Sequence, residues 1–203
     1  MGESNRSTEI HRRLGESAAV EGRRSALKAM LTAHVPLDAT EAEHRRSMLV
    51  LCDAEGDPFS RSHFKPGHFT ASAFVLSPDM DALLLIFHGK LHRWLQPGGH
   101  IDPEDRDVVS AARREAAEET GLRDLKLLGA GPLDVDVHTI PARRAEPEHQ
   151  HFDVRFAFRA ERKEGVAASD ATDLRWVALD AVTLAGSDAS VMRAVGRLRG
   201  MAR

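Results

Sequence analysis

The sequence has one cysteine, no excess of positive charge and no long apolar run. The single Cys52 among 203 residues excludes an internal disulfide. Lys and Arg number 28 against 31 for Asp and Glu, giving a formal net charge of -3, so the chain lacks the basic field of nonspecific nucleic-acid binders. The most apolar run, residues 82–87, is far shorter than the roughly 20 residues of a membrane span. We therefore expect neither a nucleic-acid partner nor a membrane partner.

The beginning of the sequence is polar and charged. Residues 1–17 contain no apolar core that could serve as a signal peptide, which, with the lone cysteine, indicates a cytoplasmic protein. Residues 1–22 show no large apolar periodicity, so we expect a frayed or disordered start. A helix is predicted from Arg24 to His34, before Pro36, and a second one is predicted after an N-cap at Asp38.

The glycines, prolines and serines of residues 54–68 are typical of a linker or strap. We place a boundary near Lys65, between an N-terminal extension (1–65) and a main domain (66–203). Strands are predicted over 69–77, 82–88, 93–97, 151–160 and 173–179, with one or two more over 125–140 and a last helix over 188–198. Because strands and helices interleave without regular βαβ spacing, the sequence predicts an α+β fold, a sandwich with a mixed sheet.

Negative charge is concentrated on a predicted helix from Val108 to Thr120. Glu115, Glu118 and Glu119 are three and four residues apart and therefore project from one helical face. Like charges at this spacing destabilise a helix unless something compensates them. Carboxylate clusters suit hard cations, so the pattern predicts a divalent-metal site, with Mg²⁺ as the first candidate.

Glycines flank this helix. Gly98 and Gly99 precede the acidic turn and allow a close approach of the main chain to a ligand, and Gly121 occupies the C-cap position. The glycine pair, an acidic loop and REAAEETGL (114–122) together resemble the signature box of the Nudix hydrolase family. Asp105 stands where the family has a glutamate, on a loop that is one residue longer. It is either an outer metal ligand or the partner of the box arginine.

The resemblance covers roughly residues 69–185. It implies a Nudix-type α/β/α sandwich with a mixed sheet, here preceded by a short helical extension. It also implies that a loop, helix and loop bind Mg²⁺ or Mn²⁺ while water attacks a phosphorus of a diphosphate linkage. The positions that match the family's motif imply that the catalytic residues are Glu115, Glu118 and Arg114, with Arg114 orienting a carboxylate of the box. They also imply that the metal ligands are Glu115, Glu118 and Glu119.

A strand near residue 150 carries the other candidates. Its alternation predicts one polar face, made of His149, His151, Asp153 and Arg155, opposite an apolar face. Arg155 could reach a phosphate and Asp153 a sugar or base. The substrate-binding candidates are therefore Arg155 and Asp153, joined by His138 from a neighbouring strand and Arg93 from the loop ahead of the box. His149 and His151 could contact either substrate or a metal. The spacing does not choose between Glu146 and Glu148 as general base.

Three functions are compatible with these residues. The first is Mg²⁺-dependent hydrolysis of a diphosphate linkage in a nucleoside diphosphate linked to another group, or in a related nucleotide. The second is a catalytically silent domain that senses a nucleotide, although no basic recognition helix precedes Lys65. The third, isoprenoid diphosphate isomerisation, needs a protonating cysteine and a second metal cluster, and Cys52 lies before the fold. In each case the partner is a small molecule, and the N-terminal helices could form a homodimer interface.

Overall fold

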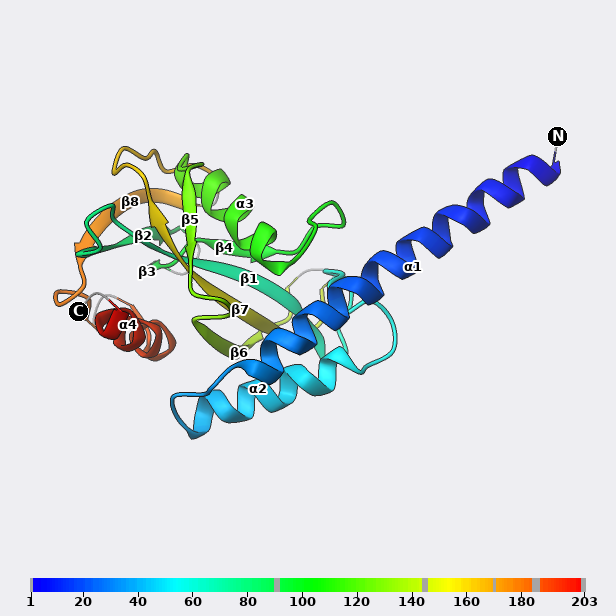
Figure 1. The fold of residues 1–203 in the computed structure, drawn as a ribbon, viewed down its shortest axis with the longest axis horizontal. Helices are drawn as coiled ribbons and strands as arrows, with labels where there is room; N and C mark the ends of the chain where they lie inside the picture. Colours follow the sequence, from blue (N-terminus) through cyan, green and yellow to red (C-terminus); the bar gives the residue numbers. More distant parts are fainter. Residues whose placement is uncertain (1, 90–91, 144–145, 170, 184–186, 202–203) are drawn as a thin grey trace.

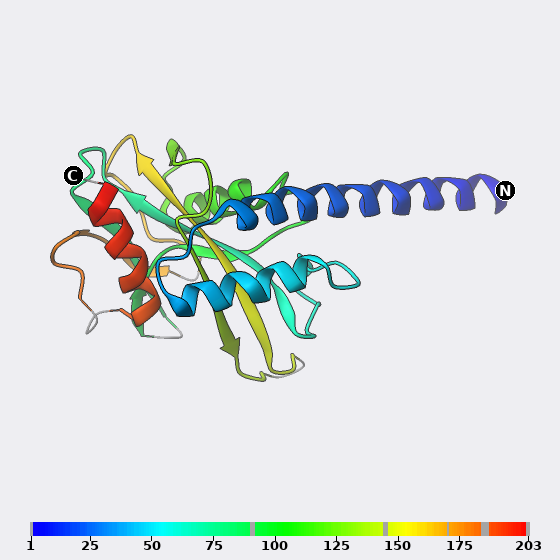
Figure 2. The ribbon, with the colours of Figure 1, turned by 60° about the horizontal axis from the view of Figure 1, so that its bottom comes forward.

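The computed structural model describes residues 2–89, 92–143, 146–169, 171–183 and 187–201, with side chains from residue 17 onward. Two helices, α1 (Gly2–Ala33) and α2 (Ala39–Cys52), precede the sheet and lie side by side (Figures 1 and 2). Asp38 is the N-cap of α2, as predicted, and its side chain accepts a hydrogen bond from the Glu41 backbone N–H at 2.8 Å. No helix of the described chain is both long enough and apolar enough to cross a bilayer.

The prediction of a disordered start is wrong, because α1 begins at Gly2. The sequence of α1 has no proline and is rich in Ala, Glu and Arg, which are good helix formers. Near its C-terminal end, α1 packs on the core through the buried side chains of Leu27 and Leu31. Since adding a residue to an existing helix is far easier than nucleating a new one, this buried end supports the polar turns ahead of it.

Eight described strands form one mixed sheet with the order β3-β2-β1-β7-β5, and β4, β6 and β8 pair with β1, β7 and β2. The strands β1 and β7 are parallel, and the other pairs are antiparallel. The bounds are β1 Gly67–Leu76, β2 Ala82–His88, β3 Arg93–Leu95, β4 Gly98–His100, β5 Leu125–Leu128, β6 Asp134–Ile140, β7 His149–Ala160 and β8 Ala171–Ala178. Two further helices are α3 (Val108–Thr120) and α4 (Ala189–Met201). The mixed sheet with helices confirms the predicted α+β sandwich.

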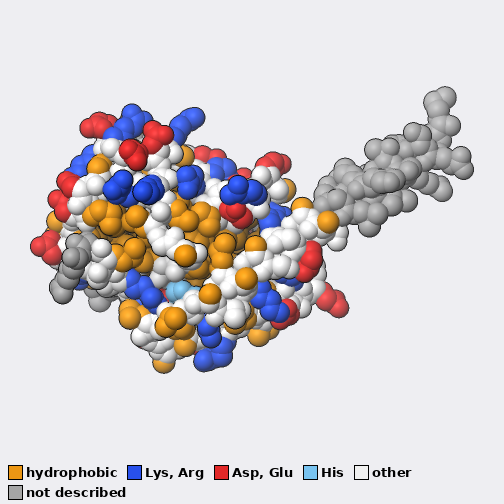
Figure 3. Space-filling model, in the orientation of Figure 1, with side chains coloured by type: hydrophobic (Ala, Val, Ile, Leu, Met, Phe, Trp, Pro, Cys, Tyr) orange, Lys and Arg blue, Asp and Glu red, His pale blue; other side chains and the backbone are white. Residues whose placement is uncertain are grey.

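One face of the sheet is apolar along both central strands. Phe69 and Ala71 of β1 and Phe152 and Val154 of β7 share a buried core with side chains of α1, α2 and α3. The N-terminal helices therefore contribute to the same core as the box helix α3. In the space-filling view, hydrophobic side chains also gather on the surface between α1 and α4 (Figure 3).

The opposite face of β1 changes character along its length. His68, Thr70 and Ser72 form its polar half, whereas Phe74 and Leu76 pack beneath α4 in a second core cluster. Period-two alternation places all five on one face. Thr70 and Ser72 of the polar half line a cavity instead, and the candidate site lies there.

Candidate active site

The sequence fixes both ends of α3. Asp107 is the N-cap and forms a capping box with Ser110, and Gly121 ends the helix at φ 71°. Glycine has no Cβ and therefore adopts a left-handed φ without steric strain, so Gly121 ends the helix where the motif predicts. These caps set which residues of α3 face the glycine pair.

Arg114 connects the acidic residues of the box. Its Nε and Nη2 donate hydrogen bonds to the two carboxylate oxygens of Asp105 at 3.1 and 2.8 Å. Its Nη1 donates to Glu115 at 2.8 Å and to Glu118 at 3.3 Å. The hydrogen bonds to Asp105, followed by those to Glu115, raise the pKa of Arg114. The longer loop therefore still brings Asp105 to the box arginine. This contact is the one expected of an arginine partner, and the role of Asp105 as an outer metal ligand stays a prediction.

Two of the three glutamates contact the glycine pair. The backbone N–H of Gly98 donates to Glu119 Oε2 at 2.9 Å. A Cβ atom at Gly99 would lie 2.6 Å from the Glu115 carboxylate carbon. Burial raises the pKa of Glu115, and the hydrogen bond from Arg114 opposes this rise. Gly99 thus provides the space that the Glu115 carboxylate occupies.

Glu118 lies differently from the other two glutamates. Its side chain is 54% exposed, against 15% for Glu115, and it contacts Arg114. The three carboxylates share a helical face of α3. In donor chemistry, three carboxylates match the preference of Mg²⁺ and Mn²⁺ for oxygen.

A cavity of about 710 Å³ brings most of the predicted site together. This volume is within the range of small-molecule sites. Among the candidates from the sequence, those that line it are Gly98, Gly99, Glu115, Glu119, His138, His151, Asp153 and Arg155. Glu118, Arg114 and Gly121 are not part of the described wall. Arg93 is exposed on β3 and does not line the cavity either.

Arg155 faces the cavity, and Phe156 faces the core, so the predicted register of β7 is correct. Its guanidinium is already engaged: it donates to Asp153 at 2.8 Å and to Asp134 at 3.1 Å, and lies 3.3 Å from Asp136. Ser72 donates to Asp153 at 2.8 Å. The positive charge of Arg155 is therefore balanced by buried carboxylates, and Asp153 is held from both sides.

His68 and His100 were not predicted from the sequence, although His151 was a candidate. The ring centroids are 4.8 Å apart for His68 and His151, 5.1 Å for His68 and His100, and 5.4 Å for His100 and His151. Burial, followed by the repulsion of neighbouring histidines, lowers the pKa of His68 to about 4 and that of His151 to about 2. The available signal was the polar alternation of His68, Thr70 and Ser72 along β1.

Neither candidate for the general base lines the cavity. Glu146 and Glu148 are both exposed beside the start of β7. The negative charge of Glu146 acts to raise the pKa of His100, against the larger effect of burial, which lowers it. The choice between these two glutamates stays open.

The NUDIX domain family model matches residues 66–195. A NUDIX-family hydrolase from Clostridium perfringens is similar over 66% of this chain and 97% of its own, with 26% identity and a TM-score of 0.48. The dihydroneopterin triphosphate pyrophosphohydrolase of E. coli is similar over 64% and 92%, with 17% identity and a TM-score of 0.50, which shows the fold alone. The NUDIX domain of Shewanella oneidensis NrtR, solved with ADP ribose, is similar over 66% and 88%, with 20% identity and a TM-score of 0.48. Comparison with curated proteins found no match.

The chain belongs to the Nudix family, since the family model covers more than half of it and the box acids lie on α3 beside the glycine pair. It is a Nudix-type pyrophosphohydrolase, an enzyme that acts on acid anhydrides.

Proposed function

We propose that this hydrolase cleaves a diphosphate linkage in a nucleoside diphosphate joined to another group, or in a related nucleotide. Glu115, Glu118 and Glu119 would hold Mg²⁺ or Mn²⁺, and their carboxylate oxygens suit these ions. The observation that carries the proposal is the placement of Glu115 and Glu119 against the glycine pair, at the wall of a cavity of about 710 Å³. When bound, the ion supplies neutralisation of the phosphate oxygens and activation of water.

The residues of the chain itself would bind and orient the substrate. Arg114 holds Asp105, Glu115 and Glu118 in one arrangement and keeps the acidic groups from separating. Asp153 and His138 present polar atoms to the cavity and are our candidates for sugar or base contacts. Arg155 remains a proposed phosphate contact, and it would make that contact while still bonded to Asp153. Contact between Arg93 and substrate stays a prediction.

The two alternatives differ in what they require. A silent sensor would bind a nucleotide without turnover. Isoprenoid diphosphate isomerisation needs a cysteine at the reacting carbon atoms. Cys52 is fully buried in the core, does not line the cavity, and has a pKa raised to about 11 by burial. This location disfavours the isomerase.

A substrate panel tests the proposal. Nucleoside diphosphate sugars, dinucleotides, coenzyme A and nucleoside triphosphates would each be incubated with the full chain, with Mg²⁺ and with Mn²⁺, and the products identified. We expect metal-dependent release of a nucleoside monophosphate, or of another phosphorylated fragment, from at least one compound. Saturable nucleotide binding without any product would favour the sensor instead.

The proposed partner is a small nucleotide-type molecule in the cytoplasm, and a homodimer through the N-terminal helices is part of the proposal. Val35, Leu37 and Val50 support it, since they are 76%, 57% and 72% exposed at or near α1 and α2. Sedimentation of the full chain should then give twice the monomer mass, and Val50→Glu should restore the monomer. A monomer at all concentrations would remove this part of the proposal.

A further inference from the structure

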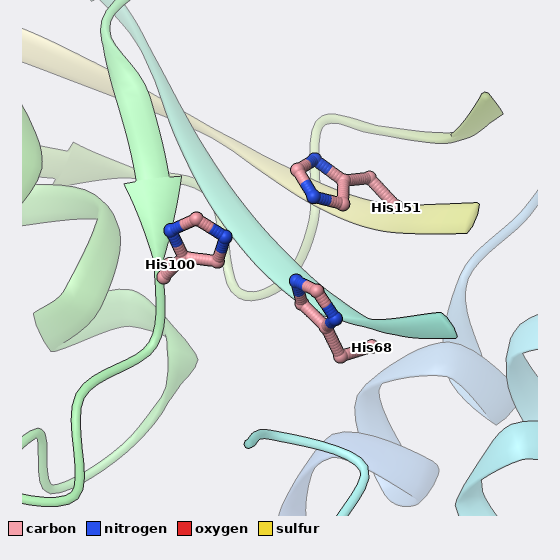
Figure 4. A group of neighbouring side chains, drawn as sticks. All are labelled: His68, His100 and His151. Carbon is pink, nitrogen blue, oxygen red and sulfur yellow. The ribbon is translucent and has the colours of Figure 1, made fainter. Parts of the chain in front are cut away.

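We propose that His68, His100 and His151 form a binding site for a divalent transition-metal ion, with Zn²⁺ the preferred ion, separate from the carboxylates of the box. The three rings come from β1, β4 and β7 and point toward one another (Figure 4). One ligand atom from each lies within 4.8 Å of the other two.

The sheet register creates this cluster. His68 pairs with His151 across the parallel strands, and His100 pairs with Thr70, one step further along the same face of β1. Because side chains two residues apart on a strand share a face, the three imidazoles meet although they are far apart in the sequence. The cluster is therefore a consequence of how three strands align, and two of its members line the cavity.

The hydrogen bonds of His68 leave one nitrogen for a ligand. Its Nδ1 lies 3.3 Å from the His63 carbonyl oxygen, which can only accept, so Nδ1 carries the proton. Nε2 then has a lone pair, and it is buried without a hydrogen-bond partner. Metal-binding histidines commonly donate their other ring N–H to a backbone carbonyl in this way, which fixes the tautomer and the ring orientation. A buried acceptor without a partner costs free energy, and a coordinated ion would satisfy it.

Neighbouring histidines show the same arrangement. His149 Nδ1 lies 2.8 Å from the Pro147 carbonyl oxygen, and its ring stacks on His68 at 5.1 Å. His138 Nδ1 lies 3.2 Å from Asp136 Oδ2, and its ring is 5.6 Å from that of His151. Two further imidazoles thus border the cluster. Either could supply a fourth ligand, as could water from the cavity.

The chemistry of the donors selects the ion. Neutral imidazole suits Zn²⁺ and other late first-row ions, whereas Mg²⁺ requires oxygen. In a tetrahedral site with Zn–N bonds of about 2.0 Å the ligand nitrogens lie roughly 3.3 Å apart. The separations within 4.8 Å seen here would close to that value by side-chain rotation. Three histidines and an open fourth position form a common arrangement for zinc.

Metal titration of the full chain tests the site. The protein would first be dialysed against a chelator, then titrated with Zn²⁺ in excess Mg²⁺ by calorimetry, and with Co²⁺ by visible absorption. We expect one Zn²⁺ per chain and the intense Co²⁺ bands of a four-coordinate site. Loss of a hydrogen-bond partner of a ligand costs about 10–100-fold in metal affinity, so His151→Gln and His100→Gln, which remove ligands, should each weaken Zn²⁺ binding by roughly a hundredfold or more.

Two control variants complete the design. His92→Asn removes an exposed histidine at φ 52°, a conformation that asparagine tolerates, and should leave Zn²⁺ affinity unchanged. Glu118→Gln alters the box and should also leave it unchanged, which separates this site from the proposed Mg²⁺ site. Circular dichroism would establish that the variants are folded. Absence of stoichiometric Zn²⁺ binding to the wild type, or equal affinity in the wild type and both cluster variants, would overturn the proposal.

Discussion

Gly99 has no side chain where the carboxylate of Glu115 lies, and a Cβ atom there would be 2.6 Å from it. The obstructing group is the far end of a flexible side chain, so the carboxylate can rotate away without disturbing the fold. We predict that Gly99→Ala lowers turnover at least tenfold and raises the Mg²⁺ concentration needed for half-maximal rate, with little change in melting temperature. Steady-state kinetics across a Mg²⁺ titration measure both effects.

Gly196→Ala is the matched control for this change. Gly196 lies within α4, where an added Cβ would have no atom within 4 Å. We expect wild-type kinetics and a slightly more stable protein, by about 0.5–1 kcal/mol, since alanine is the better helix former. Equal kinetics in Gly99→Ala and wild type would show that the position of Glu115 is not critical.

The sequence predicts part of the site residue by residue. Glu115, Glu118 and Glu119 could be predicted because three- and four-residue spacing alone places them on one helical face. His68 and His100 could not, since their meeting depends on how β4 aligns with β1, and this alignment involves only three described residue pairs. The contact between Asp105 and Arg114 could not be predicted either. It depends on the path of the loop before α3, and the spacing of residues in the sequence does not determine that path.

At the scale of elements, α4 is held to the sheet by buried ion pairs. Arg193 donates to Asp134 at 2.6 and 3.0 Å and to Asp136 at 3.1 Å. The side chain of Asp134 is 0% exposed, and burial raises its pKa. We predict that Arg193→Met destabilises the protein by about 3 kcal/mol or more, because it leaves a buried carboxylate with less compensation. Urea unfolding measures the difference.

Arg46→Met provides the comparison for this prediction. Arg46 pairs with Glu43 on the exposed surface of α2, where an ion pair contributes at most about 1 kcal/mol. If the two variants lose similar stability, the Arg193 cluster does not hold α4 in place.

Prediction of the elements succeeded where a local pattern decides the structure. The helix α3 has its predicted bounds because Asp107 and Gly121 cap it, and β2 has its predicted bounds because an apolar run sits between turns. The strand β4 was missed, since its glycines have no strand propensity and it forms by pairing with β1. The N-terminal turns of α1 were missed because nothing local anchors them.

At the scale of the whole molecule, Glu41 joins the N-terminal helices to the C-terminal one. Its carboxylate contacts His34 at 2.7 Å, the Leu37 backbone N–H at 2.5 Å and Arg197 of α4 at 2.6 Å. Burial opposes ionisation, but these partners lower the pKa of Glu41 to about 2. The extension and the domain therefore share a buried charge as well as a core, and the division at residue 65 stays a prediction.

This depressed pKa predicts a loss of stability in acid. The unfolded chain protonates Glu41 near pH 4.5, whereas the folded chain does so near 2, so the unfolded state binds more protons between these values. The stabilisation of the folded state by ionised Glu41 is therefore complete above about pH 4.5 and disappears as the pH falls toward 2. We expect Glu41→Gln to be less stable by about 3 kcal/mol at neutral pH and to lose less stability on acidification.

Urea unfolding between neutral pH and about pH 3 checks this, with Glu43→Gln as the control. Glu43 lies on the same helix and is exposed, so its variant should follow the wild type. A wild-type pH profile in Glu41→Gln would mean that this contact does not stabilise the assembly of extension and domain.

The central claim is that the box carboxylates serve metal-dependent hydrolysis and not the fold. Glu118 tests it best, because its side chain is 54% exposed and, among the described side chains, it bonds to Arg114 at 3.3 Å. Glu118→Gln keeps the shape and removes the charge. The same change at Glu104, an exposed acid of the preceding loop, is the matched control.

The measurement is turnover of the best substrate from the panel across a Mg²⁺ titration, alongside the melting temperature of the metal-free protein. We predict that Glu118→Gln lowers turnover by roughly a hundredfold to a thousandfold, since a lost ligand removes several kcal/mol of transition-state stabilisation. Its melting temperature should equal that of the wild type or slightly exceed it, because repulsion between neighbouring carboxylates is relieved. Glu104→Gln should match the wild type in both measurements. Wild-type turnover in Glu118→Gln at ordinary Mg²⁺, or collapse of its fold, would contradict the account.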